Sequence, residues 1–369
     1  MTKPQNENPY LLLTPGPLST SPSVKAVMLR DWCTWDDDYN QGVVQVIRRR
    51  LVELATRADG YTSVLMQGSG TFVVEALLGT AVARDGKVLV LTNGAYGRRI
   101  ARIADLLDID HTVIESDERV PPDPRAVDTA LAGDPAITHV AMVHGDTSTG
   151  ILNPVAAVGE IVRRRRRVFM VDAMSTFGGI PLDLEECGID FLVSIANKCI
   201  QGVPGFGFVV ARAGALADCD DRPRSLSLDL YDQWRVMEEG GGKWRFTSPT
   251  HTVRAFAQAL VELDEEGGIE RRAERYRENH RVLVEGMERL GFRCFLPEAC
   301  RSPIIATFHD PESGDYEFAR FYADLKRQGF VIYPGKATRA NTFRIGTIGH
   351  VFPEDIRSLL VAIDQSITW

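Results

Sequence analysis

The chain has 369 residues, of which 44% are hydrophobic and 25% are charged, and this balance excludes an intrinsically disordered protein. The net charge of −8 argues against a nucleic acid as the main partner, because binding to a phosphate backbone needs concentrated positive charge. The length is sufficient for one large domain and a smaller one.

The first residues, MTKPQNENPY, contain no apolar segment behind a basic start, so we expect no secretory signal. No window approaches the roughly 18 consecutive apolar residues of a membrane span. Six cysteines are scattered without CxxC or metal-ligand spacing, which favours reduced thiols over a disulfide framework. We therefore expect a cytoplasmic protein without a bound metal and without membrane contact.

Two charged runs occur in the first half of the chain. Residues 163–167 are five consecutive arginines between a helix-like segment (154–162) and the apolar run VFMV, where cations suit the C-terminus of a helix. Residues 36–38 are three aspartates, and no histidine lies beside them to complete a metal site. We expect the arginines to form a solvated helix end and the aspartates to lie in a polar loop between two helices.

Apolar strand-like runs alternate with helix-like runs along the first two thirds of the chain. Helices are expected at 71–83 and 98–107. Strands are expected at TSVLMQ (62–67), KVLVLT (87–92), THVAMVH (138–144), VFMVDA (168–173) and FLVSIA (191–196). Such alternation is typical of βαβ units and a mostly parallel sheet. A further strand, FGFVVAR (206–212), follows a glycine- and proline-rich stretch, which indicates a sharp reversal into an antiparallel neighbour.

The last third of the chain has a different pattern. A long helical stretch (252–287) leads into a region where helices alternate with the strands PIIATF (303–308) and FRIGT (343–347), as in a small α+β domain. The fold class is therefore α/β. We expect an N-terminal segment (1–17) that packs on the small domain and the active site, a large domain (18–265) and a small C-terminal domain (266–369).

Polar motifs follow several of the predicted strands, and in parallel sheets functional residues gather at the carboxyl ends of the strands. Ser69, Gly70 and Thr71 follow the first strand and open a helix, so their backbone N–H groups can bind an anion. This motif alone also suits a plain helix N-cap. NGAYG (93–97) presents Tyr96 from a tight turn, either for packing or for stacking on a ligand, and HGDTSTG (144–150) is a dense polar cluster.

Two ionisable residues follow the next two strands. Asp172 comes after four apolar residues, so its carboxylate needs a cationic partner or several hydrogen bonds. Lys198 follows the strand 191–195 and would lie near Asp172 at the same edge of the sheet. A solvated surface lysine is the ordinary alternative. In a partly desolvated pocket, however, the pKa of Lys198 would fall, which leaves a neutral amine that can react with an aldehyde.

An anion loop, an aromatic ring, a buried aspartate and a lysine together describe a site for pyridoxal 5'-phosphate. In that interpretation the loop holds the phosphate and Tyr96 stacks on the pyridine ring. Asp172 keeps the ring nitrogen protonated, and Lys198 carries the cofactor.

Motifs along essentially the whole chain resemble those of the 2-aminoethylphosphonate–pyruvate transaminases, a family within the fold type I, class V aminotransferases. The motifs are TPGPLS (14–19), CTWDDDYN (33–40), QGSGT (67–71), NGAYG (93–97), VDAMSTFGGIP (171–181), ANKCIQGVPGF (196–206), KWRFTSPTHT (243–252), and FVIYPGK with FRIG (330–346). The resemblance implies a large domain with a mostly parallel seven-stranded sheet, a homodimer with active sites at the subunit interface, and a role in phosphonate catabolism. It also implies a ping-pong reaction that converts 2-aminoethylphosphonate and pyruvate to phosphonoacetaldehyde and L-alanine.

The resemblance implies a role for each matching residue. Lys198 is similar to the lysine that carries the cofactor, and Asp172 to the partner of its ring nitrogen. The other cofactor contacts that it implies are Ser69, Gly70 and Thr71 at the phosphate, Tyr96 on the ring, Thr147 near the phenolic oxygen, and Thr247, which reaches the phosphate of the neighbouring subunit's cofactor.

Arg344, in FRIG, resembles the arginine that binds the acidic group of both substrates, and its planar fork suits a phosphonate and a carboxylate alike. An arginine paired with a carboxylate at the edge of the core is the alternative. Arg245 and Lys336 are lesser candidates for anion binding. One motif departs from the family pattern: HGDTSTG stands where HxETTTG is expected, with a shorter acid at Asp146 and Ser148 in place of a threonine.

Two other functions remain open from the sequence. A related class V enzyme, such as an alanine–glyoxylate or serine–glyoxylate aminotransferase, would keep Lys198 and Asp172 and differ in amine preference. A non-catalytic binding module would keep the fold and hold the cofactor or a phosphonate. A cofactor absorbance band that changes on adding an amine would separate an enzyme from such a module.

Overall fold

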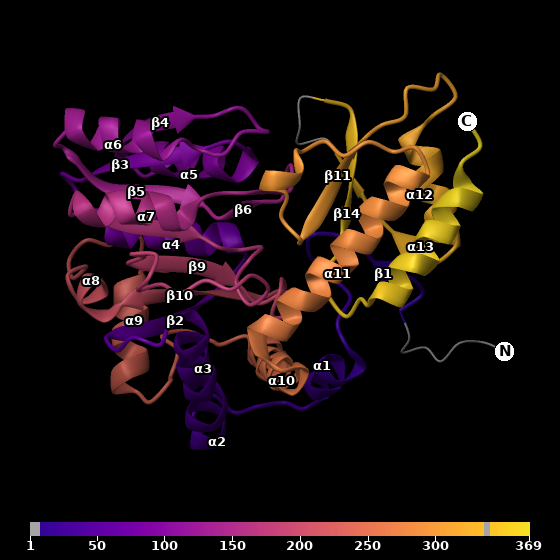
Figure 1. Ribbon diagram of the computed structural model, residues 1–369. Helices are drawn as coiled ribbons and strands as arrows, with labels where there is room; N and C mark the ends of the chain where they lie inside the picture. The colour runs from indigo at the N-terminus through magenta and orange to yellow at the C-terminus, as the bar shows by residue number, and fades with distance from the viewer. Residues whose placement is uncertain (1–7, 336–339) are drawn as a thin grey trace.

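The structure is a computed structural model that describes residues 8–335 and 340–369. Its centre is a seven-stranded sheet with helices on both faces (Figure 1). The spatial order is β2 (Tyr61–Gln67), β10 (Phe206–Arg212), β9 (Phe191–Ile195), β8 (Val168–Asp172), β5 (Ile137–Val143), β3 (Lys87–Thr92) and β4 (Asp110–Glu115). Only β10 runs antiparallel to its neighbours. The mostly parallel sheet and the antiparallel strand at 206–212 are therefore confirmed.

Six of the seven strands coincide with predicted runs, and β4 is the exception. Its sequence, DHTVIE, mixes exposed and partly buried residues at the edge of the sheet, so it lacks the continuous apolar run of the central strands. In contrast, all five residues of β9 are buried.

The helices that surround this sheet begin and end within a few residues of the predicted positions where predictions were made. They are α1 (Pro22–Ala26), α2 (Asp37–Tyr39), α3 (Val46–Ala55), α4 (Gly70–Ala81), α5 (Ala95–Leu106), α6 (Pro124–Gly133), α7 (Val155–Arg164), α8 (Ala213–Ala217) and α9 (Leu230–Glu239). The arginine run lies at the end of α7, and Arg163 and Arg164 occupy its last turn. The aspartate run differs from the predicted loop, because Asp37 and Asp38 form the first turn of α2, where acidic side chains interact favourably with the helix dipole.

A second, smaller region follows. Its three antiparallel strands have the order β11 (Ile305–His309), β14 (Thr342–Gly346) and β13 (Tyr333–Pro334). The helices α11 (Gly268–Arg289), α12 (Phe318–Arg327) and α13 (Pro353–Ser366) pack beside them (Figure 1). Phe308, Phe321 and Phe343 are central to a hydrophobic core that is distinct from the core around the large sheet.

The predicted long helix (252–287) is two helices. α10 (Thr250–Glu266) ends at Gly267, and α11 starts at Gly268. Both glycines have positive φ angles, of 101° and 82°, which residues with a side chain adopt only rarely. Continuous helical periodicity across this pair of glycines therefore hid a sharp break.

The N-terminal part of the chain contacts the small region first. β1 (Leu11–Leu12) pairs in parallel with β12 (Phe330–Val331), and the chain then runs through Thr14–Pro17 towards Lys198. Residues 1–7 of the predicted N-terminal segment lie outside the described residues, and the boundaries at 17/18 and 265/266 stay predictions. Among the described helices, none is both long and apolar enough to cross a membrane.

Candidate active site

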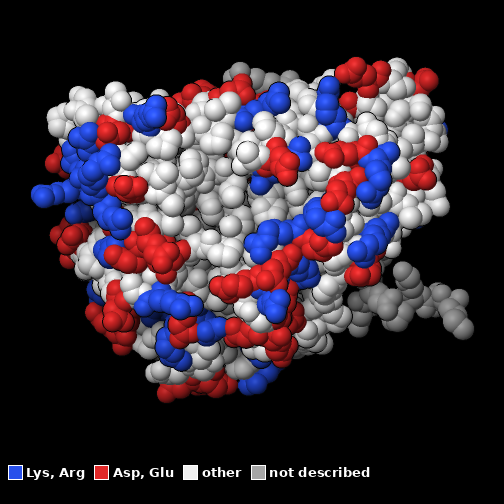
Figure 2. Space-filling view, viewed as in Figure 1, with Lys and Arg blue, Asp and Glu red and all other residues white. Residues whose placement is uncertain are grey.

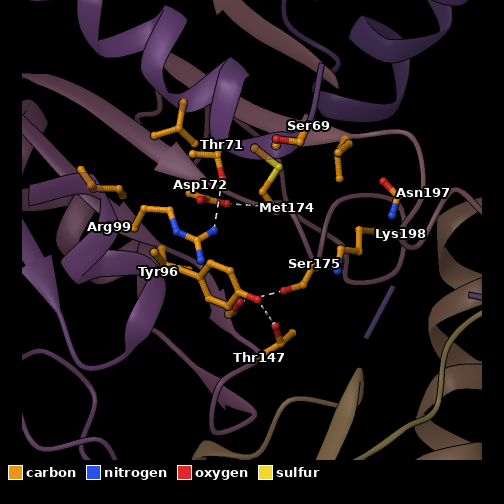
Figure 3. A pocket seen from close by; sticks show the side chains of 16 residues that line it. Ser69, Thr71, Tyr96, Arg99, Thr147, Asp172, Met174, Ser175, Asn197 and Lys198 are labelled. Atoms are coloured by element: carbon orange, nitrogen blue, oxygen red, sulfur yellow. Dashed lines mark hydrogen bonds between the residues drawn. The ribbon is translucent and has the colours of Figure 1, made fainter. Parts of the chain in front are cut away.

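A pocket opens where five parallel strands of the large sheet end. Its lining residues come from the last residues of β5, β8 and β9 and from the segments that follow β2, β3, β5, β8 and β9. Figure 3 shows Lys198 and Asn197 on one side of this pocket and Asp172, Thr71 and Arg99 on the other, with Tyr96 and Thr147 below. Polar side chains from distant parts of the sequence meet here because the carboxyl ends of parallel strands share one edge of the sheet.

Lys198 lies in the turn after β9, and its ammonium donates a hydrogen bond to the carbonyl of Pro15 at 2.6 Å. Burial lowers the pKa of Lys198 to about 8, although the negative charge of Asp172 opposes this effect. The approach is tight at Gly16, where an added Cβ would lie 2.7 Å from Nζ of Lys198. The lysine is therefore held close to the N-terminal segment in an environment where its ammonium loses a proton more easily than that of an exposed lysine.

Asp172 is the last residue of β8 and is buried. Its carboxylate accepts one hydrogen bond, from the backbone N–H of Met174 at 2.9 Å, and within the described residues it forms no ion pair. Burial raises the pKa of Asp172 to about 7; the nearby Asp146 adds to the rise, and Arg99 and Lys198 reduce it. A cation placed against this carboxylate would restore its charged form.

The predicted anion loop lies at the start of α4. Ser69 is the N-cap residue, and its side chain makes no capping hydrogen bond. Gly70 passes so close to Met174 that a Cβ would lie 2.9 Å from the thioether sulfur. The first N–H groups of a helix and its dipole favour an anion at this position.

Arg99 is a pocket residue that sequence reasoning missed. Its guanidinium donates to the hydroxyl of Thr71 at 3.2 Å and lies 5.0 Å from the ring centroid of Tyr96 (Figure 3). Residues three apart on a helix share a face, so the spacing of Tyr96 and Arg99 in α5 was a usable signal. Arg99 adds a positive charge beside the anion loop.

The departure at HGDTSTG has a local structural role. Gly94, the N-cap residue of α5, has no side chain to cap the helix. Asp146 supplies the missing acceptor, because its carboxylate accepts from the backbone N–H groups of Tyr96 at 3.2 Å and Ser148 at 2.9 Å. A Cβ on Gly94 would lie 2.2 Å from this carboxylate. The short acid therefore fits against the glycine and fixes the start of the helix that carries Tyr96.

Thr147 and Arg344 join the pocket to the small region. The hydroxyl of Thr147 donates to the hydroxyl of Tyr96 at 3.4 Å, and its carbonyl accepts from Arg344 at 2.8 Å. Arg344 is buried in β14 and also donates twice to the carbonyl of Pro334. Within the described residues no carboxylate pairs with it, so the alternative of a buried ion pair finds no support there.

Thr247 and Arg245 do not reach this pocket within one chain. Thr247 is exposed and lines a separate pocket with Phe72 and Phe246. Arg245 forms an ion pair with Asp232 at 2.8 Å. Lys336 lies outside the described residues.

The chain is similar to known proteins over nearly its whole length. A family described as "Aminotransferase class-V" matches residues 49–339. A 2-aminoethylphosphonate–pyruvate transaminase of Syntrophobacter fumaroxidans is 63% identical and covers 98% of this chain and 97% of its own, and one of Vibrio vulnificus is 60% identical over 98% and 99%. The crystal structure of a ureidoglycine–glyoxylate aminotransferase from Bacillus subtilis superimposes with a TM-score of 0.89 at 26% identity, over 100% of this chain and 94% of that one.

Proposed function

The chain belongs to the class-V aminotransferase family, and we infer that it transfers the amino group of 2-aminoethylphosphonate to pyruvate. The products of this transfer are phosphonoacetaldehyde and L-alanine. The observation that carries the conclusion is the 57% to 63% identity, over 98% of the chain, to relatives that bear this activity in their names. The enzyme thus acts in two half-reactions, each with a small anionic substrate.

We propose that the pocket holds pyridoxal 5'-phosphate, the cofactor on which class-V aminotransferases depend. Three features of the pocket fit the cofactor. The buried Asp172 lacks an ion-pair partner among the described residues and suits a protonated ring nitrogen. The start of α4, with Arg99 beside it, suits a phosphate. When bound, the cofactor supplies an aldehyde for the amino group and a ring that accepts electrons.

The chain's own residues would then have separate tasks. Lys198, as a neutral amine, would take the proton from the substrate carbon that bears nitrogen and pass it to the cofactor within the same half-reaction, and it would move a proton in the opposite direction in the second half-reaction. Asp172 holds the proton at the ring nitrogen. Tyr96 would stack on the ring, and Thr147, whose hydroxyl donates to the Tyr96 hydroxyl, would bind the phenolic oxygen. Ser69, Gly70 and Thr71 bind the phosphate.

Arg344 is proposed to bind both substrates through their acidic groups. Its bonds to the carbonyls of Thr147 and Pro334 use three of the five N–H groups of a guanidinium, so donors remain for an anion. We expect Arg344→Ala to lower kcat/KM for 2-aminoethylphosphonate and for pyruvate by about 10²-fold each, as for the loss of a charged hydrogen bond. Steady-state kinetics with each substrate varied in turn measures both effects.

Two further variants control this experiment. Arg344→Lys keeps the charge and loses the fork, and should fall between the wild type and Arg344→Ala. Arg281→Ala removes an exposed arginine of α11 that pairs with Glu278 and Glu285 outside the pocket, and it should leave both values unchanged. A defect of Arg344→Ala with only one of the two substrates would mean that different residues bind phosphonate and carboxylate.

The pH dependence of cofactor capture should report on Lys198. Only the neutral amine attacks an aldehyde, and burial lowers the pKa of Lys198 to about 8. We therefore expect the rate at which cofactor-free enzyme takes up pyridoxal phosphate to rise with pH through about 8 and then to level off. Stopped-flow absorbance measures this rate, with Lys198→Ala as the background. A rate that still rises steeply above pH 9 would contradict a pKa lowered by burial.

A homodimer is proposed as the active form. Phe72 is 53% exposed and directly follows the anion loop, and Phe246, which is 55% exposed, directly precedes Thr247. These three residues line one pocket. Exposed aromatic side chains beside a functional loop are typical of a surface that a partner covers. Contact between two copies of this surface would bring Thr247 of one chain towards the anion loop of the other.

Mixed dimers test this arrangement. Lys198→Ala and Thr247→Ala should each impair homodimers, and a mixture that exchanges subunits should regain up to about half of the wild-type activity in each hybrid dimer. The reason is that one site of the hybrid combines an intact Lys198 with an intact Thr247 from the other chain. Activity measured before and after subunit exchange shows whether Lys198 and Thr247 of different chains form one active site. A mixture no more active than its two parents would place both residues in one chain's site.

The proposed amine is tested by comparing donors. With pyruvate as acceptor, kcat/KM for 2-aminoethylphosphonate should exceed that for serine by about 10²-fold or more, since a phosphonate dianion makes stronger charge-assisted bonds to arginine than a carboxylate does. A preference for serine would mean that the enzyme instead uses an amine that carries a carboxylate, as a serine–glyoxylate aminotransferase does.

A cytoplasmic location stays a prediction, and the six unpaired cysteines are in keeping with it.

A further inference from the structure

The turn that carries Lys198 is held from two sides. On one side, the thiol of Cys199 donates to the carbonyl of Ser175, in the segment that follows Asp172. On the other side, the carbonyl of Cys199 accepts hydrogen bonds from two side chains of α11, Arg272 at 2.7 Å and Tyr276 at 3.2 Å. The residue next to the lysine is thus attached both to the loop with the buried aspartate and to the helix that leads into the small region.

Arg272 is unusually deep for a charged side chain. The residue is only 1% exposed. The opposite surface of α11, the long diagonal helix in Figure 1, faces the solvent and carries interspersed acidic and basic residues in Figure 2. A buried guanidinium is costly unless its charge and its donors are matched. Glu266 balances the charge through an ion pair, and the carbonyl of Cys199 takes another donor.

The Glu266 carboxylate also binds Arg275, which in turn donates to the carbonyls of Gly349 and Val351. Glu266 is the last residue of α10, and the two arginines lie in the first turns of α11, so this cluster spans the break between the helices. The angle at the break and the position of the Cys199 carbonyl are therefore linked through a single guanidinium.

Tyr276 also binds the carbonyl of Cys199. It is completely buried, and its hydroxyl donates to the Cys199 carbonyl while accepting from the side chain of Gln201 at 2.7 Å. Gln201 itself has a positive φ of 68° at the end of the turn. Two residues that follow Lys198 in the turn are therefore bonded to the same tyrosine.

We propose that Arg272 and Tyr276 are positioning residues that hold the Lys198 turn at the distance the cofactor's aldehyde requires, an inference that rests on the proposed function. Neither residue lines the pocket, so they act through the backbone of Cys199. Their loss should weaken the covalent link between Lys198 and the aldehyde, a C=N bond that forms with release of water, without weakening the contacts to the phosphate and the ring.

The test compares two forms of the cofactor on full-length, cofactor-free protein. Pyridoxal phosphate can form the link to Lys198, whereas pyridoxamine phosphate has an amine in place of the aldehyde and cannot. Both forms share the phosphate and the ring. The ratio of their dissociation constants, measured by equilibrium dialysis, therefore isolates the contribution of Lys198.

Relative to wild type, we expect pyridoxal phosphate to bind about threefold more weakly to Tyr276→Phe and at least about tenfold more weakly to Arg272→Lys. The binding of pyridoxamine phosphate should be unchanged in both variants. Tyr276→Phe removes a single oxygen and keeps the packed ring, so it tests the proposal even if the arginine variant folds poorly. Tyr316→Phe, which removes a hydroxyl bonded to Asp310 in the small region, is the matched control and should change neither constant.

Two outcomes would overturn the proposal. One is unchanged binding of both cofactor forms in both variants. The other is equal weakening of both cofactor forms, which would indicate a general structural role. The Lys198→Ala variant separates these outcomes from failure of the proposed function: if it shows the same ratio as wild type, Lys198 does not form the link at all.

Discussion

Replacing Lys198 by alanine is expected to lower the rate of transamination by about 10⁴-fold, the upper range for the loss of a positioned acid–base group, to which the loss of covalent attachment adds. The lysine has the required environment: its ammonium lies 2.6 Å from the carbonyl of Pro15, and burial lowers its pKa to about 8. The proton transfer proposed for Lys198 would occur in both half-reactions. We therefore expect both to slow by a similar factor in single-turnover measurements.

The variant should still bind the cofactor, because the start of α4 and the carboxylate of Asp172 are unchanged. Exhaustive dialysis should remove the cofactor from Lys198→Ala and leave it on the wild type. Lys87→Ala, which removes a surface lysine that pairs with Asp134 at 3.0 Å, controls for the loss of a positive charge elsewhere. Full turnover by Lys198→Ala would disprove the assignment of the catalytic base.

Replacing Asp172 by asparagine is expected to slow proton abstraction by about 10³-fold, since the neutral amide no longer holds a proton at the ring nitrogen. The substitution keeps the shape of the side chain and an oxygen that can accept from the N–H of Met174. Rapid-mixing absorbance of the first half-reaction gives the rate. Asp183→Asn, at a carboxylate outside the pocket that accepts from Thr56, is a suitable control.

Although it slows the reaction, the same substitution should stabilise the cofactor-free protein at alkaline pH. Burial raises the pKa of Asp172 to about 7, so the folded state resists ionisation of this group. The resulting cost is absent near pH 4, develops as pH rises, and is complete above about pH 7. Asp172→Asn should therefore raise the unfolding temperature relative to wild type at pH 8 and not at pH 4. A lower unfolding temperature at pH 8 would mean that the ionised carboxylate stabilises the empty pocket.

Much of this architecture follows from local sequence signals. Each central strand is a short apolar run, and the polar motif after it lies at the pocket because parallel strands end at one edge. The order of the motifs is therefore sufficient to predict that Asp172 and Lys198 line the same pocket, as they do in the structure. Local signals were weaker at the edge of the sheet, where β4 has no continuous apolar run.

Other features depend on contacts between distant segments. Nothing in the arginine-rich sequence of α11 distinguishes the buried Arg272 from its exposed neighbours, because its partner, the Cys199 carbonyl, is 73 residues away. The capping of α5 by the carboxylate of Asp146, at a helix start where Gly94 has no side chain, likewise depends on two strand ends that meet only in the fold. Thr247 is exposed in a single chain, so its proposed role depends on a second subunit.

The most direct test of the account is a single turnover of purified enzyme, loaded with its cofactor, on 2-aminoethylphosphonate without pyruvate. We predict that the visible absorbance band of the lysine-linked cofactor disappears, that phosphonoacetaldehyde is released in an amount equal to the sites, and that pyruvate alone then restores the band and yields L-alanine. An unchanged band with 2-aminoethylphosphonate, together with a full response to serine or alanine, would contradict a phosphonate amine as the substrate.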